Sequence, residues 1–407
     1  MTTCISGTGL VFRHPAQLPL SVFIVLVVAY TAIAPNFDQP FINYAFASAI
    51  IFLFVTRPEM AHCTAAVTAG VGLSLCHAFF PQVANIAVPS VNLYAGMLGR
   101  GSLVVLGWRT IWATPQQSRR RLLESLLVAV AIVLFVLASL VALHLTALAR
   151  SRVLDFYLYL FDGSLGFQPS FLLGRLFSRY KLVAGLIRDA YFGLPLVIAL
   201  ASVGYLKCGS PWRPLAILAS AGLLGYLLYF VFPAAGPIYA VGSRFPNSPL
   251  TFAMLEQLHS HSSVLPPRVP RNAMPSLHMA WALLVWFNCR RFSRVWRRLA
   301  ATYVVLTVVG TLGAGEHYLA DLVVALPFSV AVQALWTQAP AAARYAVMAG
   351  GAILTFMWLA VLRYGADFFA LSPAIPWGCM SVSTIISLAL LHQLRSREGA
   401  FVDHPAL

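Results

Sequence analysis

The chain has 407 residues, of which 60% are hydrophobic and only 10% are charged. Soluble domains carry about 25% charged residues, and a large soluble chain still needs a polar shell, so this composition excludes a soluble protein and indicates an integral membrane protein. The net charge of +15 would suggest nucleic-acid binding in a soluble chain. Here most basic residues lie in short segments between apolar runs, which is typical of topology signals, and we expect no nucleic-acid partner.

We expect helices throughout, because a membrane-spanning helix needs about 20 mostly apolar residues and apolar runs of roughly that length recur along the chain. The first run follows Arg13 and His14. It ends in Ala-Ile-Ala before Pro35, a poor first residue for a mature chain, so we interpret it as an uncleaved helix rather than a removable signal peptide. About twelve spans are predicted, near residues 18–35, 41–56, 61–80, 89–108, 122–147, 182–206, 214–232, 275–289, 299–316, 317–337, 344–363 and 375–394.

The densest basic segment is CRRFSRVWRR at residues 289–298, with five arginines between two short apolar runs. Cytoplasmic loops carry the excess of arginine and lysine, so we predict this segment on the cytoplasmic side. Two longer segments then fall on the opposite side. Residues 148–181 are apolar and aromatic but are interrupted by Asp155 and Asp162, which favours an interfacial or re-entrant helical hairpin. Residues 233–273 form a proline-rich loop of the length typical of functional lids.

Two histidine motifs are predicted on that same non-cytoplasmic side. Pro275 suits a helix start, because the N–H that proline lacks would be unpaired there. Ser276 and His278 would then lie in the first turn, where free backbone N–H groups favour an anion. Downstream, His317 and Asp321 are four residues apart and would share one helix face. The carboxylate of Asp321 would fix the tautomer of His317 and leave the other ring nitrogen as nucleophile or base.

Other interpretations of these residues stay open. The pair of His317 and Asp321 would also suit a purely structural hydrogen bond, and two histidines with a carboxylate would suit a metal ion. We favour phosphotransfer because the helix start with a serine and a histidine explains more of the local sequence. The six cysteines are far apart and form no C-x-x-C motif, so they predict neither a zinc site nor a disulfide framework. Ordinary packing roles are expected for His62, His77, His144 and His392.

The motifs MPSLH and G-x-H-Y-x-x-D, at residues 274–278 and 315–321, resemble two signatures of the type 2 phosphatidate phosphatase superfamily. The leucine of PSLH, with FPAAGP upstream and HYLAD downstream, is similar to the inositol phosphorylceramide synthase branch, the inositolphosphotransferases. The resemblance covers about residues 150–320. It implies that His317 attacks the phosphorus of a lipid phosphodiester to give a phosphohistidine, with Asp321 orienting it. It also implies that His278 protonates the leaving oxygen and then activates the acceptor hydroxyl, without a metal or an organic cofactor.

The chain departs from the phosphatase pattern at the arginines that bind phosphate. The phosphatases have a lysine, six residues and then Arg-Pro, whereas Lys207 and Arg213 are one residue too close and fall on the predicted cytoplasmic side. The phosphatases also have an arginine six residues before the nucleophilic histidine, where this chain has Thr311. The inositolphosphotransferase branch likewise lacks both. The phosphate-binding residues that we predict are Arg271, Ser276, Arg188, Arg175 and Arg244. For each of these arginines, the alternative role is that of an interfacial anchor.

We therefore predict an all-α polytopic membrane protein with about twelve transmembrane helices and a six-helix catalytic core of the phosphatidate phosphatase type at residues 122–337. Transmembrane helices at 1–121 precede it, and two helices with a short cytoplasmic tail at 338–407 follow it. The expected function is transfer of a phosphate-linked head group, such as inositol phosphate, between lipid substrates. The expected location is a bacterial inner membrane, with the site facing the periplasm or exterior.

A lipid phosphate phosphatase is the alternative within the enzyme class, and a transporter or flippase is the alternative outside it. A transporter of this length would often show helices broken by glycine or proline at matching positions in two halves, and we find no such pair. Nor does the chain contain a Walker motif.

The predicted sidedness is testable by labelling. A cysteine introduced at Ser262, in a background without the native cysteines, is expected to react with an impermeant thiol reagent added to intact cells, because the arginines of residues 289–298 place the 233–273 segment outside. Labelling only after permeabilisation would invert the topology.

Overall fold

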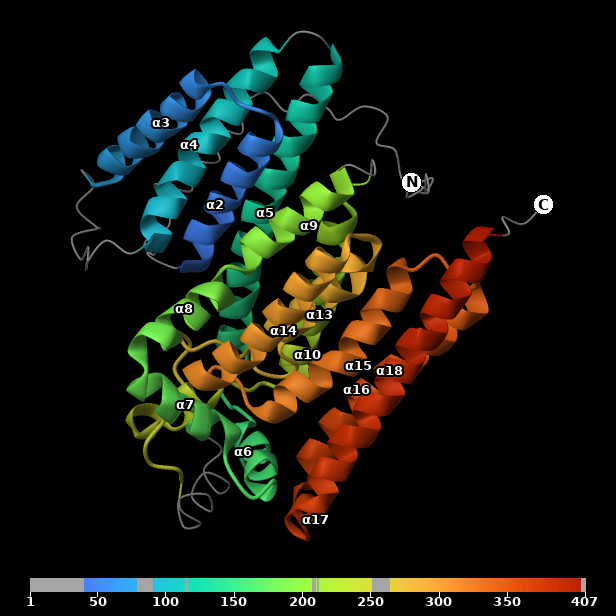
Figure 1. The fold of residues 1–407 in the computed structure, drawn as a ribbon. Helices are drawn as coiled ribbons and strands as arrows, with labels where there is room; N and C mark the ends of the chain where they lie inside the picture. The colour runs from blue at the N-terminus through green and yellow to red at the C-terminus, as the bar shows by residue number, and fades with distance from the viewer. Residues whose placement is uncertain are drawn as a thin grey trace. The chain divides into compact units, whose positions relative to one another are not determined.

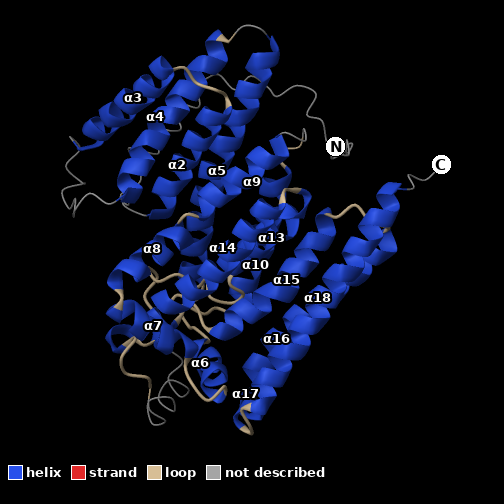
Figure 2. Cartoon of the chain, viewed as in Figure 1, coloured by secondary structure: helices blue, strands red, loops and turns tan. Residues whose placement is uncertain are grey.

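The fold is helical throughout the residues that the computed structural model describes, which are 40–78, 91–113, 116–206, 210, 212–250 and 264–403. Their helices are labelled in Figure 1. Figure 2 draws these residues as helices and loops without a strand, and the only extended pairing among them is one isolated antiparallel bridge between Arg152 and Val264. The predicted all-α class is thereby confirmed. The predicted first span at 18–35 and the labelling position Ser262 lie outside the described residues.

The chain divides into two compact units. The first comprises residues 1–138 and 192–216, and the second residues 139–191 and 217–407. In the first unit, helix α4 (Val91–Trp112) packs along both α2 (Pro40–Val55) and α3 (Met60–Ala78), and α2 also contacts α9 (Leu194–Leu206). Small residues permit this close packing, as is common between membrane helices. The boundary between the two units falls within α5 (Gln116–Ala149).

The second unit is built around α15 (Leu319–Trp336), which contacts α13 (Leu277–Asn288), α16 (Ala341–Tyr364) and α18 (Ala374–Asp403) (Figure 1). Its apolar stretch is 67% buried, against 28–50% for the other long apolar helices, so α15 forms the centre of this unit. The remaining elements of this part of the chain are α6 (Asp155–Ser164), α7 (Pro169–Arg179), α8 (Lys181–Phe192), α10 (Arg213–Val231), α11 (Pro237–Ala240), η2 (Gly242–Arg244), η3 (Cys289–Arg291), α14 (Arg294–Ala314) and α17 (Ala366–Ala370).

The number of spans differs from the prediction. Among the described residues, six helices are long and apolar enough to cross a membrane, or seven if α8 and α9 count as one bent span, and three further apolar helices are shorter. The predicted segments from residue 41 onward do fall on helices, but a count of twelve spans is not confirmed. The reason is that several of these helices are shorter than the roughly 20 residues that a hydrocarbon core requires. Several apolar helices still indicate a multi-pass integral membrane protein.

The segment 148–181 folds into two short helices, α6 and α7, joined by a turn at residues 165–168. Pro169 begins α7, where its missing N–H leaves no hydrogen bond unmade. On α7, Leu172, Arg175 and Leu176 are exposed whereas Phe171 is buried. One face of α7 therefore packs on the protein, and the other presents apolar and basic side chains.

The loop that follows α10 makes a close backbone contact with the turn between α14 and α15. Gly236 has φ +104°, and a Cβ atom at this position would collide with the carbonyl oxygen of Glu316. The Ile238 N–H donates to the Gly315 carbonyl at 2.9 Å in the same contact. The loop can therefore lie against the turn only because residue 236 has no side chain.

This contact predicts different outcomes for two glycine substitutions. Gly166 also has a positive φ, +94°, but a Cβ atom there would meet nothing within 4 Å. Gly166→Ala should cost only the backbone strain, about 1–2 kcal/mol, and leave turnover unchanged. Gly236→Ala should lower the melting temperature further and reduce turnover by roughly 10²-fold, because it displaces the turn that bears His317. Melting in detergent and turnover would be measured on the same preparations; equal effects of the two variants would contradict the contact.

Candidate active site

Helix α13 begins with a serine cap that also reaches the second histidine motif. Ser276 is fully buried, has extended backbone angles, and accepts a hydrogen bond from the Met279 N–H at 3.4 Å. The helix starts at Leu277, so Pro275 precedes the cap instead of occupying the first turn as the sequence predicted. The hydroxyl of Ser276 lies 3.2 Å from Nε2 of His317. One side chain thus closes the start of α13 and contacts the candidate nucleophile.

His317 lies just before α15, not on a helix face. The helix begins at Leu319, and Asp321 is its third residue, forming a capping box with Tyr318. The Asp321 carboxylate accepts the Tyr318 N–H at 2.8 Å and lies 3.3 Å from Nδ1 of His317. The predicted pairing of His317 with Asp321 is present, but it forms across the helix start. The physical reason is that a carboxylate at this position satisfies an N–H group that has no partner within the helix.

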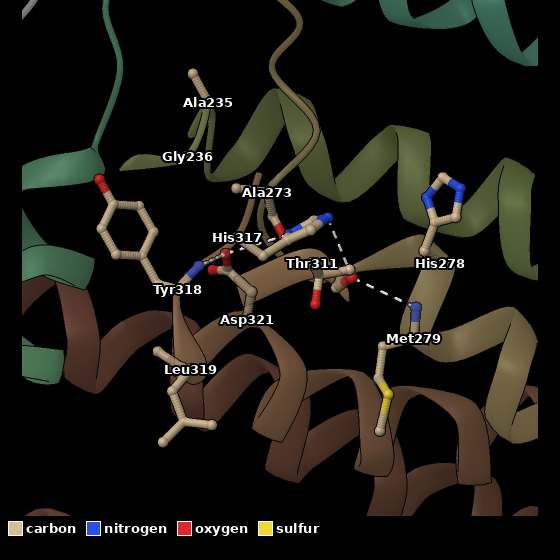
Figure 3. A network of polar contacts seen from close by, with 12 residues as sticks. Ala235, Gly236, Ala273, His278, Met279, Thr311, His317, Tyr318, Leu319 and Asp321 are labelled. Carbon is tan, nitrogen blue, oxygen red and sulfur yellow. Dashed lines mark hydrogen bonds and ion pairs between the residues drawn. The ribbon is translucent and has the colours of Figure 1, made fainter. Parts of the chain in front are cut away.

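The hydrogen bonds around His317 assign its tautomer. Nδ1 lies 3.2 Å from the carbonyl oxygen of Ala273, which can only accept a hydrogen bond. The proton is therefore on Nδ1, shared between Ala273 and Asp321, and Nε2 keeps its lone pair and accepts from the Ser276 hydroxyl. The Asp321 and Ser276 contacts are made by the two different ring nitrogens, and Figure 3 shows Asp321 beside the imidazole of His317. A neutral imidazole in this tautomer is suited to act as a nucleophile through Nε2.

His278 belongs to the first turn of α13 and lies in an aromatic environment. Its Nδ1 is 3.2 Å from the hydroxyl of Tyr191, and its ring packs on Tyr191 and Trp281 at centroid distances of 4.3 and 5.7 Å. His278 and His317 interact electrostatically, and Figure 3 places both rings beside the start of α13. The structure thus brings together His278, His317 and Asp321, the three predicted catalytic residues.

Two buried carboxylates of α6 hold the segments that carry the site. Asp155 accepts hydrogen bonds from the N–H groups of Ala235 and Gly236 at 3.0 and 2.8 Å, and from the Tyr318 hydroxyl at 3.1 Å. Asp162 accepts the Leu319 and Ala320 N–H groups at 2.9 and 3.3 Å. Burial is the largest influence on both and raises the pKa of Asp155 to about 6 and that of Asp162 to about 8.

In the sequence, Asp155 and Asp162 stand out only as interruptions of an apolar segment. A signal for a shared role was present, because residues seven apart lie on one face of a helix. The spacing could not name their partners. Those partners are backbone N–H groups about 80 and 157 residues away along the chain.

The predicted phosphate-binding residues have different surroundings. Arg271 is fully buried, and its guanidinium donates to the backbone carbonyls of Arg150, Ser151, Leu265, Pro266 and Val269. It joins two loops in this way, and the geometry gives no support to a phosphate-binding role for it. Ser276 lies at the site as described above. The other three are exposed side chains: Arg175, Arg188 and Arg244.

Arg213 begins α10, whereas the Ala235–Gly236 contact with Asp155 follows the end of the same helix. The five arginines of residues 290–298 likewise follow the end of α13, whose start carries Ser276 and His278. The histidines and these basic segments thus lie at opposite ends of their helices.

No group of three or more His, Cys, Asp or Glu side chains suited to a metal ion occurs among the described residues. The polar groups at the site are a histidine paired with a carboxylate, His317 and Asp321, and a second histidine, His278, on α13.

The apolar helices and the cluster of His278, His317 and Asp321 together indicate a helical membrane protein with a histidine-based candidate site. Residues 157–335, less than half of the chain, match the family described as the PAP2 superfamily. Members of this superfamily are lipid phosphatases or phosphotransferases, which supports an enzyme. No curated protein and no solved structure matches the chain.

The geometry predicts a graded set of losses for the three polar residues. His317→Ala should reduce turnover by about 10⁴–10⁶-fold because it removes the attacking atom, and His278→Ala should be comparably damaging. Asp321→Asn should cost about 10²–10⁴-fold, since it removes charge and orientation but no bonding atom. Turnover and melting temperature would be measured on the same detergent-solubilised preparations. Losses that only follow unfolding, or full activity of His317→Ala, would contradict the assignment.

Proposed function

We propose that this protein transfers a phosphate-linked head group from a donor lipid to an acceptor lipid hydroxyl, through a phosphohistidine on His317. The observation that carries the proposal is the state of His317. Its Nδ1 is held in the protonated form by Ala273 and Asp321, and its Nε2 lone pair is directed toward Ser276. This is the arrangement that an imidazole needs to attack phosphorus.

In the first half of the proposed reaction, the Nε2 lone pair forms a bond to phosphorus and the bond from phosphorus to the donor lipid oxygen breaks. His278, in the protonated form that the negative charge of a bound donor phosphate favours, gives its proton to that leaving oxygen, so a neutral lipid alcohol departs. The new positive charge on His317 is stabilised by the buried Asp321 carboxylate at 3.3 Å. The Ser276 hydroxyl, which gives up its contact with Nε2, is then available to a phosphate oxygen, consistent with the role predicted for it.

In the second half, neutral His278 accepts the proton of the acceptor hydroxyl, and the resulting oxygen attacks phosphorus while the bond to Nε2 breaks. The hydroxyl of Tyr191, 3.2 Å from Nδ1 of His278, orients the ring through both steps. The product is the acceptor lipid carrying the phosphate-linked head group. Both histidines return to their starting protonation states, so the cycle balances without a redox partner.

The acceptor is proposed to be a lipid alcohol rather than water because the phosphatase arginines are missing. Thr311 stands where the phosphatase pattern has an arginine, and its hydroxyl donates back to the carbonyls of Thr307 and Val308 in its own helix. A singly charged phosphodiester needs less positive charge around it than a phosphomonoester, which carries up to two charges. An inositol phosphate donor of the kind suggested by the sequence resemblance fits this requirement. The site is proposed to face the side of the membrane opposite the arginines of residues 290–298.

Substrate assays in proteoliposomes distinguish transfer from hydrolysis. With phosphatidylinositol and a lipid alcohol such as a ceramide, we expect the head group to move to the alcohol, as measured by lipid mass spectrometry. With phosphatidate alone, we expect little inorganic phosphate. Proteoliposomes containing His317→Ala serve as the matched control. Rapid phosphate release from phosphatidate, absent from the control, would favour a lipid phosphate phosphatase instead.

A further inference from the structure

Glu316 is a carboxylate fixed directly beside the candidate nucleophile. Gly315 ends α14 in the left-handed conformation with φ +73°, and the Glu316 N–H donates to the Thr311 carbonyl at 3.1 Å. The side chain then accepts hydrogen bonds from the Tyr239 hydroxyl to both carboxylate oxygens, at 3.2 and 3.3 Å. Backbone and side chain are therefore both held, and the carboxylate has a defined position next to His317.

The Glu316 carboxylate acts on His317 and on the tyrosine that contacts His278. It interacts electrostatically with His317 and with the hydroxyl of Tyr191, the group that contacts His278. Burial raises the pKa of Glu316, while His317 and the hydrogen bond from Tyr239 favour its ionised form. Because Glu316 directly precedes His317 and interacts with it electrostatically, a phosphate bound at His317 would also experience the charge of this carboxylate.

Arg271, the first arginine that the sequence assigned to phosphate, does not direct its positive charge toward Glu316. The guanidinium of Arg271 is taken up by backbone carbonyls, and Thr311 replaces a phosphatase arginine. In a site of low dielectric, one nearby carboxylate changes the affinity for an anion strongly, and each further negative charge on that anion increases the repulsion.

We infer that Glu316 is a specificity-determining residue, which selects a singly charged phosphodiester donor by repelling the doubly charged phosphate of a phosphomonoester. The inference rests on the proposed function and deepens it, because it explains why the same pair of histidines would act on phosphodiesters and exclude phosphatidate. Glu316 is adjacent to the nucleophile but forms no bond to phosphorus. Its effect is exerted on the affinity for the donor, not on the bond-breaking steps.

The charge and the hydrogen bond of Glu316 are separable by substitution. Glu316→Gln removes the negative charge and keeps an oxygen that accepts from Tyr239. Tyr239→Phe removes the hydrogen bond but keeps the carboxyl group, whose ionised form His317 still favours. If Glu316 only supports the fold through Tyr239, Tyr239→Phe should lower activity on every donor, Glu316→Gln, which keeps the acceptor oxygen, should lower it less, and neither should change the donor preference. If its charge selects the donor, only Glu316→Gln should change the preference.

The test compares two donors that share a product. Phosphatidylinositol and a phosphatidate with the same acyl chains both release diacylglycerol when the phosphorus is attacked, so kcat and KM are measured for each by diacylglycerol release in proteoliposomes. We expect Glu316→Gln to raise kcat/KM for phosphatidate relative to phosphatidylinositol by about tenfold or more, mainly through KM. Tyr239→Phe, and Asp367→Asn in α17 as a control for loss of an exposed carboxylate, should keep the wild-type ratio.

The outcomes separate this inference from the proposed function. An unchanged donor ratio in Glu316→Gln, with His317-dependent release from phosphatidylinositol intact, overturns the role of Glu316 alone. Release from neither donor by the wild type overturns the proposed function together with it. If Glu316→Gln does not accumulate as a folded protein, Glu316→Ser gives the same comparison of charge. Inhibition by inorganic phosphate is a second measurement, which should strengthen when the charge is removed.

Discussion

The site depends on hydrogen bonds to the free backbone N–H groups at the start of α15. The first N–H groups of a helix have no partner within it, and burial makes an unpaired N–H costly. Here Asp321 accepts the Tyr318 N–H, and Asp162 accepts those of Leu319 and Ala320. These two carboxylates fix the direction in which α15 begins, and therefore the position of His317, which directly precedes it.

The same bonds set the chemistry of His317. Because Asp321 is committed to the Tyr318 N–H, it meets the imidazole only at Nδ1, where Ala273 supplies a second acceptor. Ala273 is in turn held by the Ala234 carbonyl, beside the Ala235 and Gly236 N–H groups that bond Asp155. The Ser170 hydroxyl donates to the carbonyl of His317 at 2.8 Å. Three separate chain segments thus fix one ring, so the reacting nitrogen is oriented before substrate binds.

Part of this arrangement could be predicted from the chain because it is local. A helix start near Pro275-Ser276 was predicted, although Ser276 caps α13 and does not lie in its first turn. The contact between His317 and Asp321 was predicted from their four-residue spacing, although α15 starts two residues later than a shared helix face would require. Arg271 was assigned to phosphate because it precedes the motif, and the structure uses it to join loops. A guanidinium has five donors, and nothing local in the sequence indicates whether carbonyls or a ligand will accept them.

The sequence by itself determined the class of this protein. Apolar runs of near-spanning length force helices, since a lipid environment requires backbone groups to be satisfied within the segment, and the spacing of two histidines, a serine and an aspartate indicated phosphotransfer. Only the tertiary structure decided which groups meet at long range. Asp162 reaches α15 from 157 residues away, and Tyr239 reaches Glu316 from 77. Such pairs depend on how helices pack, and packing is a property of the whole fold that no local pattern encodes.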